Sequence, residues 1–162
     1  MSENTKFHVE EREIGFDGLI EELVAFIHRK PEYHYRIVVG TDSKPAGQVR
    51  FVTSVAIVRV GNGGRYFWTR SEEMPAPTLR DRIFKEAMYS IAFTQELKSR
   101  LKDKIGEEFF WDQKISVHLD VGINGPTKDL VDGVVGMVRG YGFEAVIKPD
   151  SFGAFVLADR HT

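Results

Sequence analysis

Four carboxylates on four separate predicted elements are the residues of this 162-residue chain best suited to chemistry. They are Asp42, Glu86, Asp120 and Asp159. Asp42 ends the strand-like run 37–41, and Asp120 ends a second such run, 115–119. Hard divalent cations take oxygen ligands gathered from separate elements, and acids at the ends of core strands can supply them. The pattern therefore predicts a shared site for Mg²⁺ or Mn²⁺.

A carboxylate cluster of this kind suits phosphodiester hydrolysis by two metal ions. One ion activates a water and the other stabilises the leaving oxygen, with the ions about 3.5–4 Å apart. Mg²⁺ takes few protein ligands, which leaves coordination positions for water and phosphate. Ser43 and Lys44, which follow the first acid, could contact the scissile phosphate or its neighbour. Asn124 lies between a predicted strand and a predicted helix start, a position that suits phosphate binding through backbone amides.

An ordinary structural role is open for each of these residues. Asp42 and Asp120 could satisfy turn amides at the strand ends. Glu86 could pair with Arg82 four residues before it, and Asp159 with the arginine that follows it. Lys44 could be a solvated loop charge. The four acids are worth more together than singly, because the element order brings them to one place.

The elements that position these residues follow from local patterns. Apolar side chains recur at helical spacing before Pro31, and the Gly-Asn-Gly-Gly stretch at 61–64 indicates a tight hairpin between two strands. Thr78 is a predicted helix N-cap. The predicted order is a helix at 16–30, strands at 35–42, 50–60 and 65–70, a helix from 79 into the 90s, a strand at 115–120, a helix at 127–140, a strand at 145–147 and a short helix from 150 or 151. This order implies a mixed α/β sheet with helices on both faces.

Glu86 has an unusual position on the predicted helix that starts at 79. It lies beside the apolar face, next to Ala87 and Ser90, rather than opposite it. We therefore expect it close to the sheet where the helix packs. Burying an ionised carboxylate without a partner is expensive, so this position needs a compensating group.

Length and composition narrow the class of protein. The chain is long enough for one domain with its own core, predicted to span 1–162 with an N-terminal helical extension at 1–34 and a core at 35–162. It has no cysteine and no apolar run of the roughly 20 residues that a membrane helix needs. The N-terminus lacks the form of a signal peptide, and we expect a cytoplasmic protein. A net charge of −2 argues against tight nonspecific nucleic-acid binding by the whole surface.

The order of elements and acids resembles the YkuK-like family of bacterial proteins in the ribonuclease H-like superfamily. The segments that carry the resemblance are Gly40-Thr41-Asp42-Ser43-Lys44, His118-Leu119-Asp120-Val121-Gly122, Lys148-Pro149-Asp150-Ser151 and Ala158-Asp159-Arg160. It implies a five-stranded sheet, three strands antiparallel and then two parallel, over residues 35–162. It also implies that the four acids hold two divalent metals and that the protein is a Mg²⁺- or Mn²⁺-dependent nuclease. The type of nucleic acid and the oligomeric state are not specified.

A second class of function stays open, a noncatalytic ribonuclease H-like module that binds nucleic acid or a protein partner. The near-neutral charge favours it, as does the absence of a strongly basic insertion after the first core helix, where acids interrupt the lysines of 98–108. The four acids disfavour it, since a binding module has no need of mutually repelling carboxylates. Other phosphate enzymes fit less well, because neither an Asp-x-Asp pair after the first core strand nor a Gly-x-x-x-x-Gly-Lys-Ser/Thr loop is present.

Overall fold

One mixed sheet forms the centre of the protein in a computed structural model that describes residues 4–45 and 47–151. Across these residues the sheet has seven strands in the order β2-β1-β5-β4-β3-β6-β7. The strands are β1 (Phe7–Val9), β2 (Arg12–Ile14), β3 (Tyr35–Ser43), β4 (Phe51–Arg59), β5 (Gly64–Arg70), β6 (Ser116–His118) and β7 (Glu144–Val146). The helices are α1 (Phe16–Arg29), α2 (Leu79–Ile105) and α3 (Val131–Gly140), with 3₁₀ turns at Glu107–Phe110 and Lys128–Leu130.

The antiparallel centre of the sheet agrees with the sequence. β3 pairs with β4 along its full length, from Tyr35 opposite Arg59 to Ser43 opposite Phe51. β4 then turns into β5 through a tight connection in which Gly61 and Gly63 have positive φ angles of 78° and 84°. Residues other than glycine rarely adopt positive φ angles, and this backbone conformation allows a tight turn between the two strands. The hairpin signal in the sequence is thus confirmed.

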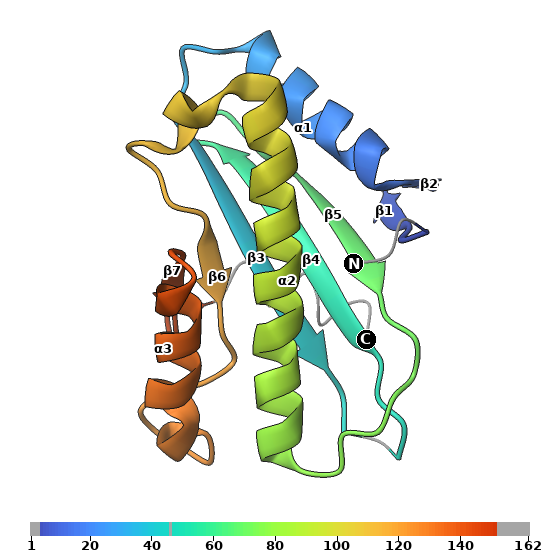
Figure 1. Cartoon of the computed structure of the whole chain (residues 1–162), viewed down its shortest axis with the longest axis vertical. Helices are drawn as coiled ribbons and strands as arrows, with labels where there is room; N and C mark the ends of the chain where they lie inside the picture. Colours follow the sequence, from blue (N-terminus) through green and yellow to red (C-terminus); the bar gives the residue numbers. More distant parts are fainter. Residues whose placement is uncertain (1–3, 46, 152–162) are drawn as a thin grey trace.

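β3 also forms the boundary between the antiparallel and parallel parts of the sheet. β6 pairs with β3 in parallel, and β7 pairs with β6 in parallel. The carboxyl ends of β3, β6 and β7 therefore point to the same edge of the sheet (Figure 1). Acids at the ends of these strands are brought together by that arrangement.

The expected five strands were too few, because the segment before α1 adds two more. β1 and β2 form a short antiparallel hairpin, and β1 extends the sheet next to β5 through His8 opposite Trp68. The ring of Phe7 lies 5.3 Å from that of Phe16 and 5.6 Å from that of Phe93, measured between centroids. Strands of three residues have too little alternation to be read from sequence. The extension at 1–34 is therefore strand as well as helix.

The described helices form one layer over one face of the sheet (Figure 1). α2 lies against β3 in the middle of that layer, with α1 on one side of it and α3 on the other. The buried core lies between this layer and the sheet and includes Leu19, Leu23, Val39, Ile57, Phe67, Ile91, Phe93, Leu97, Val117, Val134 and Val138. The element order predicted helices on both faces, whereas the described helices cover one face. The final helix predicted from 150 or 151 lies mostly outside the described residues.

α2 begins where the sequence predicted and extends further. The side-chain oxygen of Thr78 accepts a hydrogen bond from the backbone N–H of Asp81 at 3.0 Å, which confirms the N-cap. The helix continues to Ile105 and ends at Gly106, which has a φ of 90°. No helix among the described residues is long and apolar enough to cross a membrane.

Candidate metal centre

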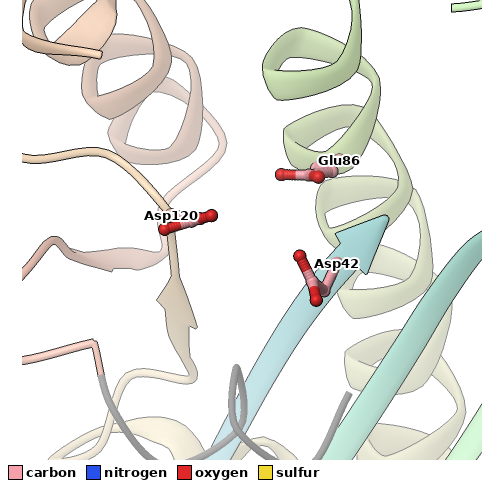
Figure 2. A group of neighbouring side chains, drawn as sticks. All are labelled: Asp42, Glu86 and Asp120. Carbon is pink, nitrogen blue, oxygen red and sulfur yellow. The ribbon is translucent and has the colours of Figure 1, made fainter. Parts of the chain in front are cut away.

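Three of the four predicted acids converge in the structure. Asp42, Glu86 and Asp120 each offer a carboxylate oxygen, and these oxygens all lie within 4.8 Å of one another. Figure 2 shows the three side chains turned toward a common space from the end of β3, from α2 and from the segment after β6. Asp159 lies outside the described residues. No other group of three His, Asp or Glu side chains in the described ranges converges in this way.

The sheet register explains why the two aspartates meet. Gly40 of β3 is paired in parallel with His118 of β6, and each aspartate follows its paired residue by two positions. Parallel neighbours lie about 4.8 Å apart and end at the same edge, so residues at equal distance along them stay side by side. Glu86 reaches the same point from above, because the first part of α2 covers the end of β3.

Glu86 is the most perturbed acid of the three. Only 6% of its surface is exposed, and its Oε1 accepts a hydrogen bond of 2.7 Å from the hydroxyl of Ser43. Burial above all raises the pKa of Glu86 to about 8; the Ser43 hydrogen bond opposes this shift, and the nearby charges of Asp42 and Asp120 add to it. Without a cation, this carboxyl therefore holds its proton at neutral pH. A bound cation would favour the ionised form.

A column of hydroxyl groups ties α2 to the sheet beside Glu86. The hydroxyl of Thr41 lies 2.7 Å from that of Ser90 on α2 and 2.9 Å from that of Thr53 on β4. Thr41 and Ser43 share the face of β3 that α2 covers, because side chains alternate along a strand. These hydrogen bonds hold α2 in place against β3, and they thereby position Glu86. Sequence reasoning did not assign them this role.

Asp120 has a different environment. Its side chain is 21% exposed, and its Oδ1 is in contact with the ammonium group of Lys148. Lys148 was not predicted as a site residue, although the segment that contains it belonged to the resemblance. A basic residue shortly after the last predicted strand was the only signal in the sequence.

The predicted substrate-binding residues lie around the same edge. Ser43 is buried and its hydroxyl is engaged with Glu86, whereas the adjacent Lys44 is exposed. Asn124 is exposed in the loop between β6 and the 3₁₀ turn that precedes α3. That loop is held by a hydrogen bond of 3.1 Å from the backbone N–H of Gly122 to the hydroxyl of Thr127. Phosphate contacts by Ser43, Lys44 and Asn124 stay predictions.

The donor set fits a hard cation. All three converging groups are carboxylates, and neither histidine nor cysteine belongs to the group. Oxygen-only ligands select Mg²⁺, Mn²⁺ or Ca²⁺ over softer metals, which prefer nitrogen and sulfur. Asp120 is the least buried of the three, with 21% of its side chain exposed.

Two comparisons with known proteins agree with the fold. A family model described as "Ribonuclease H-like" matches residues 18–162. A protein of Bacillus subtilis (strain 168), named "Uncharacterized protein YkuK", is 32% identical over 173 aligned residues, which cover 96% of this chain and 95% of the relative. The chain belongs to the YkuK-like family of ribonuclease H-like proteins. No solved structure matches it significantly.

Membership of this family confirms the resemblance inferred from the sequence segments. The mixed sheet covered by helices fits a ribonuclease H-like fold, with two more strands than expected. The name of the relative assigns it no activity.

Proposed function

We propose that the protein is a divalent-metal-dependent nuclease that hydrolyses phosphodiester bonds in nucleic acid. The observation that carries this proposal is the convergence of Asp42, Glu86 and Asp120 from three elements to within 4.8 Å. Two like charges 4 Å apart repel by about 1–4 kcal/mol between the dielectric of water and that of a protein surface. Such an arrangement destabilises the folded protein when no cation is bound, whereas with a cation the same carboxylates become its ligands.

The residues of the cluster have distinct tasks in this proposal. Asp42, Glu86 and Asp120 would hold Mg²⁺ or Mn²⁺, with Asp159 as the predicted fourth ligand. The bound ions supply an activated water and stabilisation of the leaving oxygen. Ser43 orients the carboxyl of Glu86 through its hydrogen bond of 2.7 Å.

The exposed residues at the same edge would bind the substrate. Lys44 and Asn124 are both exposed, so they are available to backbone phosphates on either side of the cleaved bond. Their separation in the chain means that two different loops would contact the nucleic acid. Phosphate contacts of this kind position the substrate and carry no sequence information.

The test is cleavage of labelled single-stranded RNA, single-stranded DNA and RNA–DNA hybrid by purified protein. Activity is expected with Mn²⁺ or Mg²⁺, and its loss is expected in excess chelator and in Asp42→Asn. Asp112→Asn is the matched control, because Asp112 is exposed and does not belong to the converging group. Product that persists equally in Asp42→Asn or in chelator would mark a contaminant and contradict the proposal.

One observation favours the alternative of a noncatalytic binding module. Lys148 already neutralises Asp120, and Glu86 holds a proton, so the cluster is partly compensated without any cation. A crystal soaked in Mn²⁺ separates the two proposals. Metal between Asp42 and Asp120 supports the nuclease. An empty cluster, together with nucleic-acid binding that is insensitive to chelator, supports the module.

A further inference from the structure

Lys148 forms an ion pair with Asp120, one of the three converging acids. It lies two residues beyond β7, at the edge where β3 and β6 also end. Its side chain is 51% exposed while its ammonium group contacts Oδ1 of Asp120. A half-exposed lysine on a candidate metal ligand can exchange its partner, because a flexible stem and open solvent allow the ammonium group to move.

The backbone of Lys148 is held far more firmly than its side chain. The N–H of Leu119 donates to the carbonyl of Val146 at 2.9 Å, and the N–H of Lys148 donates to the carbonyl of Val121 at 2.9 Å. Asp120 lies between these two hydrogen bonds. A Cβ atom added at Gly122 would come within 3.2 Å of the Cβ of Lys148, so the two segments are in close contact. The position of the lysine beside Asp120 is therefore built into the fold.

We propose that Lys148 is a catalytic residue of this site. In the metal-free protein its ammonium group neutralises Asp120, and when a divalent cation binds Asp120 the same group contacts a phosphate oxygen of the nucleic acid. The phosphate contact rests on the proposed nuclease function, whereas the neutralisation of Asp120 does not. No proton or bond is transferred by the lysine in this role.

The two halves of the proposal predict opposite effects of removing the charge. The ammonium group of Lys148 repels a divalent cation at Asp120. A variant with an uncharged side chain at position 148 should therefore bind the cation more tightly. The transition state of phosphodiester hydrolysis carries extra negative charge on the phosphate oxygens, so the same variant should react more slowly. If Lys148 only supported the loop, its replacement would neither raise the affinity for the cation nor selectively slow cleavage.

The first experiment titrates metal-free protein with Mn²⁺ and compares wild type with Lys148→Met, Lys148→Arg and Lys102→Met. Lys102 is the matched control, because it pairs with Glu107 at 3.3 Å on the surface of α2. Lys148→Met should bind Mn²⁺ about fivefold more tightly, the factor for roughly 1 kcal/mol of relieved repulsion. Lys148→Arg and Lys102→Met should bind like wild type. Unchanged or weaker binding by Lys148→Met would overturn the proposal.

The second experiment measures cleavage at saturating Mn²⁺ with whichever labelled nucleic acid the wild type hydrolyses. Lys148→Met should lose about 10- to 100-fold in kcat, the range for one charge-assisted hydrogen bond to a reacting group, and Lys148→Arg should recover part of it. Equal kcat in wild type and Lys148→Met would overturn the phosphate contact.

Failure of the proposed function gives a distinguishable result. If the wild type cleaves nothing, the nuclease proposal falls, and the phosphate contact falls with it. The Mn²⁺ titration still decides whether Lys148 neutralises Asp120. Melting temperatures of the four proteins in chelator guard against a folding defect, and a Lys148→Met protein that melts much lower and binds Mn²⁺ more weakly would assign the lysine a structural role instead.

Discussion

The repulsion between neighbouring carboxylates is reduced in different ways on the two sides of the acid cluster. On the side of β3 and α2, Glu86 is buried, accepts a hydrogen bond from Ser43 and has a pKa raised to about 8. On the side of β6 and β7, Asp120 is partly exposed and is neutralised by Lys148. The buried side compensates by holding a proton, and the open side compensates with a movable cation. The difference teaches that burial determines how strongly each acid is linked to stability.

The largest expected effect is on the buried side and depends on pH. Unfolded Glu86 releases its proton near pH 4.5, whereas the folded protein holds it until about pH 8. The folded state binds more protons in that interval, so the contribution of Glu86 to stability is full below pH 4.5 and is lost as pH rises through 8. At about 1.4 kcal/mol per pKa unit, Glu86→Gln should gain as much as about 5 kcal/mol relative to wild type across this range.

Urea unfolding of both proteins in chelator at pH 5, 7 and 9 measures this gain. Glu21→Gln, a change at an exposed position of α1, is the control and should follow wild type. Stability curves of Glu86→Gln and wild type that run parallel from pH 5 to 9 would mean that Glu86 ionises normally.

The second effect concerns the metal and compares the two sides directly. A ligand at a hundredfold excess over its dissociation constant stabilises the folded state by about 2.7 kcal/mol, and Mn²⁺ should do so for wild type. Asp120→Asn should gain much less from Mn²⁺ because a ligand is lost. In chelator the same variant should be close to wild type, since the lysine it leaves behind is half exposed. Melting curves with and without millimolar Mn²⁺ test both statements, and equal Mn²⁺ shifts in the two proteins would remove Asp120 from the site.

The third effect is the loss of the buried hydrogen bond. Ser43→Ala leaves Oε1 of Glu86 without its donor, and an unsatisfied buried polar group costs about 1–3 kcal/mol. Because that hydrogen bond lowers the pKa of Glu86, the variant should also raise it above 8. Ser99→Ala, at an exposed position on α2, should change stability by no more than about 0.5 kcal/mol. Chemical denaturation at pH 7 gives both numbers, and indistinguishable midpoints for the two variants would argue against a buried polar contact.

The smallest effect is expected on the open side. Lys148→Met breaks an ion pair whose lysine is 51% exposed, and such pairs contribute about 0–1 kcal/mol. Its midpoint of unfolding in chelator should therefore lie between those of wild type and Ser43→Ala. A larger loss for Lys148→Met than for Ser43→Ala would reverse the comparison between the two sides.

Much of the site could be predicted because it depends on local pattern. Asp42 and Asp120 each end a run with strand character, and parallel neighbours bring such ends to one edge. Thr78 and the turn at Gly61–Gly63 marked a helix start and a hairpin that the structure contains. Glu86 stood beside the apolar face of its helix, which indicated burial near the sheet.

Other features were decided only when distant segments packed together. Ser43 is the last residue of β3, yet only the packing of α2 against β3 brings its hydroxyl to Glu86, 43 positions later. The hairpin β1–β2 pairs with β5, which lies more than fifty residues later in the chain. Its strands have three residues each, too few for a strand pattern to be recognised in the sequence. Lys148 reaches Asp120 because backbone hydrogen bonds join the segments after β6 and β7. Local sequence determines which element forms, since that depends on neighbours within a few residues. Which charge meets which acid depends on how the elements pack, because only the folded chain puts their side chains within contact distance.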